Sequence, residues 1–318
     1  MKNFSYIHTL PAHQHAELDF ADVNVGRDNR LFVDPSRIHL AALAGNAWAK
    51  EADLLITSFF DALYTAAAQK DTATVCSLLR ACGEINETQL GMSRSTPRGN
   101  GASVPLIFSA INQMMNEGLF EKKLVESIAD VPIFADRVGA DRLSDWTTNL
   151  IWPVLQDFTV AQYEKYSLQK DLATKAKRFR WDSNSFSWQE CSAQYLTCNK
   201  TRILLCPKEF LHKRLLLSTE NFLKSQVLVY RQQELLDAQS SLCRQRQYKD
   251  GSIVLLEPRK KDIVATEIGE TSHTQYVRDS IKEHPHLLTD YHHLFEYQPN
   301  KEDYFISDSE LDDILYKD

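Results

Sequence analysis

The chain has 318 residues, of which 43% are hydrophobic and 25% charged, as in an ordinary globular protein with a sizeable core. Its first ten residues lack the apolar run of a secretory signal peptide, and no stretch reaches the roughly 18 apolar residues of a membrane span. We therefore expect a cytoplasmic protein without a membrane segment. None of the six cysteines forms a C-x-x-C pair, so we expect reduced packing residues.

The N-terminal residues 1–38 predict extended structure. Polar and apolar residues alternate from Glu17 to Val25, the period of a half-buried strand. A turn at 26–29 and a short apolar run at 31–33 follow, and Asp34-Pro35 ends the run. This pattern predicts a β-hairpin.

Most of the remaining chain predicts helices, and a chain with only 10 glycines favours them. Helical patterns cover 46–81, with Asp71 as an N-cap, and then 103–117, 121–129, 141–170, 208–239 and 271–297. Pro153 predicts a kink or break in the long helix, and Pro285 breaks the last segment. Short strands are expected within 171–206 and at 252–256. The predicted fold class is α+β, predominantly helical, with the N-terminal hairpin and a few short strands.

Charge varies strongly along the chain. Residues 170–261 carry 18 Lys and Arg against 9 Asp and Glu, whereas residues 262–318 carry 4 against 14. The pattern predicts a helical domain at 1–170, a basic α+β region at 171–298 and an acidic tail at 299–318. The excess of Lys and Arg in the basic region is suited to binding nucleic acid. A solvated surface that the acidic tail partly neutralises would give the same charge pattern. The tail could dock as a short helix on a basic surface or stay disordered.

Two polar segments, 84–101 and 136–145, combine carboxylates and arginines next to predicted helix starts. Paired acids spaced three or four residues apart would share a helix face and could hold Mg²⁺, which prefers oxygen ligands. We assign catalytic roles to Glu84, Glu87, Asp141 and Asp145. The predicted Mg²⁺ ligands are Glu87, Asp141 and Asp145. The alternative is that these acids cap helices and form salt bridges, for example with Arg142.

The glycine-rich loop 91–101 precedes a predicted helix, and free N–H groups at a helix start bind phosphate. The predicted phosphate-binding residues are Ser93, Arg94, Arg98, Gly99, Gly101 and Arg142. The loop matches neither the Walker A pattern nor the dinucleotide fingerprint. Its alternative role is a surface loop that caps the next helix. The segment from Asp250 to Lys260 loosely resembles the active-site pattern of restriction endonucleases, but it departs from that pattern at Pro258 and Arg259. The alternative interpretation of this segment is a turn that ends a strand.

Several short segments resemble uncharacterised bacterial proteins associated with phage-defence gene neighbourhoods. They are Phe32-Val33-Asp34-Pro35, the residues from Glu87 to Ser93, those from Asp141 to Asn149, Leu205-Cys206-Pro207-Lys208 and His284-Pro285-His286-Leu287-Leu288. The resemblance implies a role in defence or nucleic-acid metabolism, and it assigns no active-site residue.

Three functional hypotheses follow. The first is a Mg²⁺-dependent, nuclease-like or nucleotide-processing defence effector. The second is a non-enzymatic nucleic-acid- or protein-binding subunit, a sensor or adaptor in a multi-protein complex, in which other subunits or further copies of the chain are partners. The third is a nucleotide-binding regulator that uses the loop 91–101.

Overall fold

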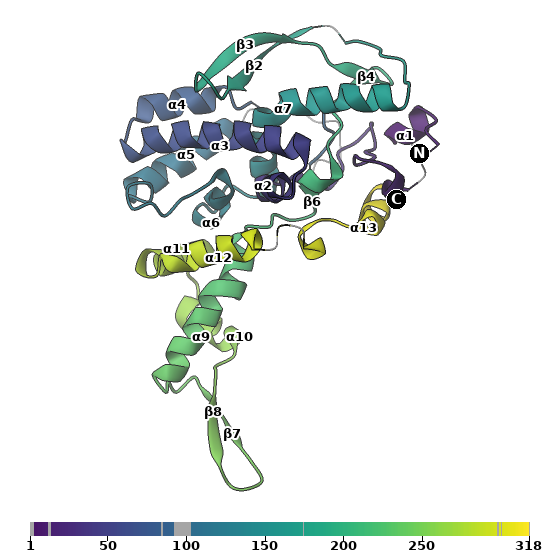
Figure 1. Cartoon of the computed structure of the whole chain (residues 1–318). Coiled ribbons are helices and arrows are strands. Elements are labelled where there is room, and N and C mark those ends of the chain that lie inside the picture. Colours follow the sequence, from purple (N-terminus) through teal and green to yellow (C-terminus); the bar gives the residue numbers. More distant parts are fainter. Residues whose placement is uncertain are drawn as a thin grey trace. The chain divides into compact units, whose positions relative to one another are not determined.

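The computed structural model describes residues 3–11, 14–83, 85–91, 103–173, 175–297, 299 and 301–317. The chain forms two compact units (Figure 1). Unit 1 comprises Met1–Val131, Arg137–Leu216 and Gln298–Asp318, and unit 2 comprises Pro132–Asp136 and Leu217–Tyr297. This division does not coincide with the boundary expected at residue 170. The fold class is α+β and predominantly helical, with small antiparallel sheets, as predicted.

Helix α3 lies at the centre of the helical layer in unit 1 and packs against α2, α4, α5 and α7. These helices are α2 (Pro35–Leu43), α3 (Ala47–Ala68), α4 (Thr72–Arg80), α5 (Ser103–Asn116) and α7 (Ala140–Lys165). Side-chain caps fix where three of them begin. Asp34 accepts from Ser36 N, Asn46 from Ala49 N, and Asp71 from Thr74 N. The predicted Asp71 cap is therefore confirmed.

Of the kink or break expected at Pro153, the break is absent, because helix α7 continues through this residue. Proline removes one backbone hydrogen bond, but Leu150, Ile151, Val154 and Leu155 around it are all buried. Burial of this apolar stripe on the neighbouring elements offsets the lost bond, because most helical stability in proteins comes from packing.

The prediction of a helix at 121–129 is wrong. Its first part forms turns, and a short 3₁₀ helix, η2 (Ile128–Asp130), is followed by α6 (Val131–Phe134). The buried Asp130 carboxylate accepts from the backbone N–H of Glu126 and of Ser127, at 2.8 and 2.9 Å. This capping box starts a new helical turn at residue 128, so the preceding segment cannot continue into it.

In the described part of unit 1, the strands form three small antiparallel pairs. They are β1 (Phe32–Val33) with β6 (Leu211–His212), β2 (Ala176–Asp182) with β3 (Ser187–Ala193), and β4 (Leu196–Cys198) with β5 (Thr201–Ile203). The predicted N-terminal hairpin is only loosely supported. The run at 31–33 is strand β1 but pairs with β6, whereas the segment before it makes isolated bridges, Asn3 with Asn24 and Phe20 with Pro207.

An aromatic cluster attaches the β2–β3 ribbon to the helices. Trp181 and Trp188 lie directly opposite each other across the two strands, and both rings contact Phe59 of α3. Trp181 Nε1 also donates to Ser58 Oγ at 3.0 Å. Burial of these large rings holds one face of the ribbon on unit 1.

The acidic tail forms part of unit 1. It contains a 3₁₀ turn, η6 (Glu302–Tyr304), and helix α13 (Asp308–Leu315). Leu311 and Leu315 are buried, and α13 packs against η1 (His15–Glu17). Lys208, in the 3₁₀ turn η3 (Lys208–Phe210), donates to Asp308 at 2.7 Å. The tail thus docks as a short helix beside basic side chains.

The remaining N-terminal helix is α1 (Phe4–Ile7).

Unit 2 is a small helical unit with a β-hairpin. Its helices are α8 (Thr219–Phe222), α9 (Leu228–Asp237), α10 (Lys260–Ile263), α11 (His273–Glu283) and α12 (His286–Glu296). Two π-helical turns, η4 (Leu223–Val227) and η5 (Val264–Ile268), join α8 to α9 and extend α10. Strands β7 (Arg244–Gln247) and β8 (Ile253–Leu256) pair as a hairpin between α9 and α10. We call residues 244–256 the arm, because it extends beyond the ends of both helices (Figure 1).

No helix in the described part of the chain combines the length and apolar composition that crossing a bilayer would need.

Candidate functional sites

Of the predicted acidic residues, the three that the structure describes, Glu87, Asp141 and Asp145, do not form a metal-holding group. Glu84 lies outside the described residues. Glu87 is buried, and its Oε1 accepts from Arg178 Nη2 at 2.9 Å and lies 3.8 Å from Arg202 Nη1. Two guanidinium groups beside one carboxylate already neutralise it, and they oppose a metal cation at the same place. Glu87 therefore ties the loop before Gly91 to strands β2 and β5.

The start of α7 lies close to the first polar segment, 84–101, at Gly91. Gly91 has a φ of +138°, and a Cβ there would lie 3.4 Å from both Asp141 Oδ1 and Asp28 Oδ2. Asp141 is exposed and Asp145 half-buried, while Arg142 Nη1 donates to the backbone carbonyl of Arg137 at 2.7 Å. In the alternative interpretation Arg142 pairs with Glu87 or Asp145, and the structure gives Glu87 the ion pair with Arg178 instead.

The remaining phosphate-binding predictions, Ser93, Arg94, Arg98, Gly99 and Gly101, lie outside the described residues. Within the described ranges, no group of three or more His, Cys, Asp or Glu side chains is placed to hold a metal ion. The Mg²⁺ site therefore stays a prediction.

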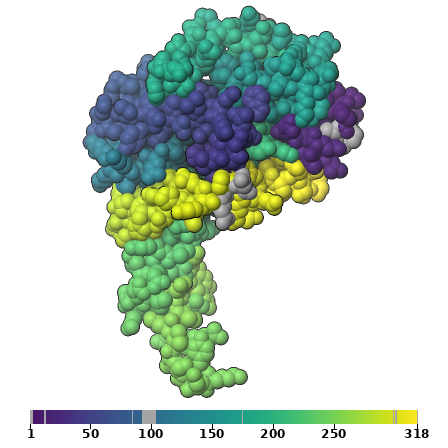
Figure 2. All heavy atoms as spheres, viewed as in Figure 1, coloured from purple at the N-terminus to yellow at the C-terminus, as the bar shows by residue number. Residues whose placement is uncertain are grey.

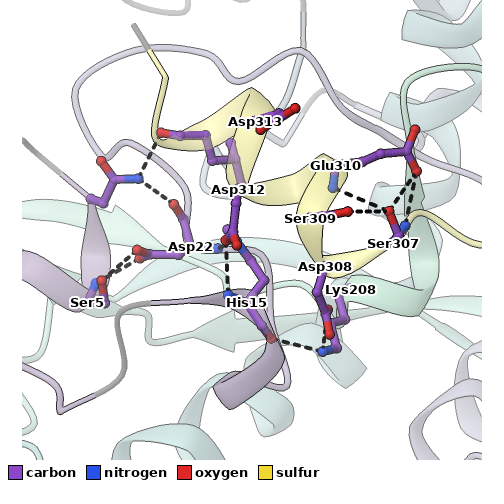
Figure 3. A network of polar contacts seen from close by, with 12 residues as sticks. Ser5, His15, Asp22, Lys208, Ser307, Asp308, Ser309, Glu310, Asp312 and Asp313 are labelled. Atoms are coloured by element: carbon purple, nitrogen blue, oxygen red, sulfur yellow. Dashed lines mark hydrogen bonds and ion pairs between the residues drawn. The ribbon is translucent and has the colours of Figure 1, made fainter.

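A buried polar network joins the two ends of unit 1 (Figure 3). His15 is fully buried, its Nδ1 lies 2.6 Å from Asp312 Oδ1, and its Nε2 lies 3.0 Å from Asp22 N. A backbone N–H can only donate, so Nε2 accepts and the ring proton sits on Nδ1. Ser5 Oγ donates to Asp22 rather than to His15. The imidazole therefore has no nitrogen left to activate a serine, and the network holds the fold together.

The arm of unit 2 carries a concentrated basic surface. Residues 240–261 contain six Lys and Arg against two Asp and Glu. All four residues of β7 are exposed, and Arg246 lies opposite Val254, which is 41% exposed. The Arg246 guanidinium stacks on the Tyr248 ring at 5.1 Å. In Figure 2 the arm is the narrow green end of unit 2. One face of the ribbon thus combines guanidinium groups with exposed apolar side chains.

Asp250, in the segment compared with restriction endonucleases, bonds within its own turn at the tip of the arm. Its Oδ1 accepts from Ser252 N at 2.9 Å and from Ser252 Oγ at 2.7 Å. These bonds hold the pKa of the Asp250 carboxyl below its usual range. The residue closes the turn of the hairpin, as the alternative interpretation of this segment requires.

A polar cavity of about 260 Å³ lies within unit 2, and no residue assigned from the sequence lines it. It is formed by Val227, Tyr230, Arg231, Glu234, Glu267, Tyr276, Asp279, Ser280, Glu283, His284 and Leu287. Val227 and Glu267 belong to the two π-helical turns, and such turns are frequent at functional sites. Periodicity could not reveal them, because a π turn shifts the helical register by one residue.

The cavity has a fixed network of charges. Arg231 Nε lies 2.9 Å from Glu267 Oε2, and its Nη2 donates to Glu267 Oε1 at 3.0 Å. Its Nη1 donates to Glu234 Oε2 at 3.0 Å, and these bonds raise the pKa of the guanidinium. Tyr276 Oη donates to Glu267 Oε2 at 2.9 Å, and burial raises the pKa of its phenol.

Comparison with known proteins places the chain in one family. Residues 10–218 match the family described as Domain of unknown function (DUF8370), so the chain belongs to that family. No curated protein and no solved structure matches the chain. The matched residues cover most of unit 1, whereas the arm and the cavity of unit 2 lie beyond them.

Proposed function

We propose that this DUF8370 family member is a non-enzymatic nucleic-acid-binding subunit that contacts double-stranded DNA with the arm of unit 2. The observation that carries the proposal is the exposed β7–β8 ribbon, with Arg244 and Arg246 on one face and Lys249 in the turn. The sequence predicted nucleic-acid binding through the basic residues 170–261, and the arm lies within that range.

The shape of the arm favours duplex DNA. The major groove of B-DNA is wide enough to admit a two-stranded β-ribbon. The major groove of A-form RNA is deep and narrow, so side chains on a ribbon cannot reach its base edges. Arginines supply phosphate contacts and pair with guanine, while the exposed Val254, on the same face as Arg246, can contact a thymine methyl group.

The charges of the arm are available for such contacts. All of β7 is exposed, and residues Arg259, Lys260 and Lys261 add three cations where the arm joins α10. Arg244 Nε donates to the backbone carbonyl of Glu257, a bond that leaves the charge of the guanidinium unneutralised. A cluster of this kind attracts phosphates and makes binding salt-dependent.

The proposal includes a cytoplasmic location, where free thiols persist; all six cysteines of the chain are free. The resemblance to proteins from phage-defence neighbourhoods supports a defence complex as the setting, in which other subunits contribute any catalysis.

The test is fluorescence anisotropy of the full chain with a labelled DNA duplex of about 20 base pairs. Changing Arg244, Arg246 and Lys249 to Gln should weaken binding by roughly tenfold or more, because three phosphate contacts are lost. The control changes Lys177, Arg180 and Lys200 to Gln, three exposed cations of unit 1. Equal affinity of the arm variant and the wild type, or an equal loss in the control, would refute the proposal.

A Mg²⁺-dependent enzyme is the second candidate. One observation favours it, namely the approach of Asp28 and Asp141 to Gly91. Two carboxylates beside Gly91, the first residue of the glycine-rich loop, are suited to a cation. Asp141→Ala should then abolish Mg²⁺-dependent cleavage of nucleic acid while the thermal midpoint stays near that of the wild type. Cleavage at an unchanged rate in that variant would remove this candidate.

A further inference from the structure

The cavity of unit 2 differs from an anion site in its charge. Four carboxylates line it, those of Glu234, Glu267, Asp279 and Glu283, against the single guanidinium of Arg231. Every nitrogen of that guanidinium already donates to Glu267 or Glu234. A phosphate or carboxylate ligand would therefore meet excess negative charge and a cation that is already paired.

The same carboxylates are spread around the cavity. Asp279 and Glu283 lie four residues apart on one face of α11, whereas Glu234 and Glu267 come from α9 and η5. In the described part of the chain they do not form a group of three metal-ligating side chains. Mg²⁺ and Ca²⁺ need several oxygens converging on one point, so this distribution suits a ligand with separated positive groups.

Aromatic side chains form part of the wall. Tyr230 and Tyr276 line the cavity with Leu287 and Val227. The Tyr230 ring lies 4.6 Å from the His284 ring, and its Oη is 3.3 Å from His284 Nδ1. Aromatic faces beside carboxylates attract organic ammonium groups, while the apolar residues accommodate methylene groups. A volume of about 260 Å³ is below that of the usual drug-sized pocket, so the ligand is small.

We infer that the cavity of unit 2 is a binding site for a small organic cation with two or more separated amino groups, an aliphatic diamine or polyamine. Glu234 and Glu267 are paired with Arg231 and Tyr276, so they form a preorganised polar wall of the cavity. Asp279 and Glu283 on α11 supply the exposed carboxylates at which the ammonium groups pair. This site is independent of the DNA contact proposed for the arm.

Isothermal titration calorimetry of the full chain, without nucleic acid, tests the inference. The probes are 1,4-diaminobutane and spermidine, with 1,4-butanediol as an uncharged match and MgCl₂ alone as a metal probe. The test variant combines Asp279→Asn with Glu283→Gln. The control combines Glu270→Gln with Asp290→Asn, two exposed carboxylates of unit 2 that do not line the cavity.

We expect saturable binding of an amine probe, at least tenfold weaker in the test variant and within twofold of the wild type in the control. The diol should give no saturable heat. Three results would overturn the inference: no amine binding up to millimolar concentration, equal binding by the test variant, or binding of the diol as tight as that of the diamine. Saturable Mg²⁺ binding lost in the test variant would instead identify a metal site.

Discussion

His15 Nδ1 lies 2.6 Å from Asp312 Oδ1, a contact that joins residues 297 positions apart in the chain. The same carboxylate oxygen accepts from the backbone N–H of His15 at 3.1 Å. Tyr316 stacks on the imidazole with a centroid distance of 4.9 Å. The C-terminal helix α13 is thus fastened to the N-terminal segment by a carboxylate that satisfies two donors of His15.

Asp312→Ala should destabilise unit 1 by about 1–3 kcal/mol, because the variant leaves the buried Nδ1–H of His15 without its acceptor. Urea denaturation followed by tryptophan fluorescence measures the loss. Asp313→Ala is the matched control, since the neighbouring Asp313 pairs with Lys317 at the surface and should contribute no more than about 1 kcal/mol. Equal losses of unfolding free energy in the two variants would show that the buried contact between His15 and Asp312 does not stabilise unit 1.

His212 should make the protein less stable in acid. Burial, with the guanidinium of Arg37 nearby, lowers the pKa of its imidazole to about 4. Asp34 and Glu310 oppose this shift, and Lys213 adds to it. His212 Nδ1 also accepts from Arg214 N at 3.1 Å, which requires the unprotonated nitrogen.

Because the folded pKa lies below the unfolded value of about 6.5, the unfolded chain takes up the proton first. The stability held above pH 6.5 is therefore lost as the pH falls toward 4. After allowance for partial exposure, the loss is about 1 to 2 kcal/mol. His212→Gln should flatten the dependence of unfolding free energy on pH across this window. His293→Gln, at an exposed position, is the control, and an unchanged slope in the His212 variant would contradict the assignment.

Glu87 should act as a structural ion-pair partner. Glu87→Gln is expected to lower the unfolding free energy by about 1–3 kcal/mol, because it leaves the half-buried Arg178 unpaired. A double-mutant cycle with Arg178→Gln measures the coupling. Glu190→Gln breaks the exposed pair with Lys177 and should cost less than about 1 kcal/mol. If Mg²⁺ stabilised the wild type but not Glu87→Gln, the carboxylate would instead be a metal ligand.

Local signals in the sequence predicted much of the fold. The periodicity of 47–68 and 140–165 and the Asp71 cap act within a few residues, so the helices could be placed without the structure. The pairing of β1 with β6 could not, since Phe32 and His212 are 180 residues apart and nothing near β1 specifies its partner. The helix expected at 121–129 failed for a local reason, the capping box of Ser127 and Asp130.

The candidate sites were harder to predict. Glu87 was predicted from the sequence as a Mg²⁺ ligand, and its partners Arg178 and Arg202 lie in distant strands that spacing cannot connect to it. The basic residues 170–261, which the sequence indicated for nucleic-acid binding, include the arm. The cavity of unit 2 was missed because its lining comes from α9, η5 and α11, each with an ordinary mixture of charges. Only their packing places Arg231 between Glu234 and Glu267.

The salt dependence of DNA binding shows whether the arm contacts the phosphates. Affinity of the full chain for one duplex would be measured from about 50 to 200 mM salt, for the wild type and for the arm variant with Gln at 244, 246 and 249. Each lost phosphate contact makes the slope of log K against log salt shallower by about 0.9, so we expect a slope shallower by about 2 to 3 in the variant. The same slope in both proteins would show that the arm does not contact the phosphates.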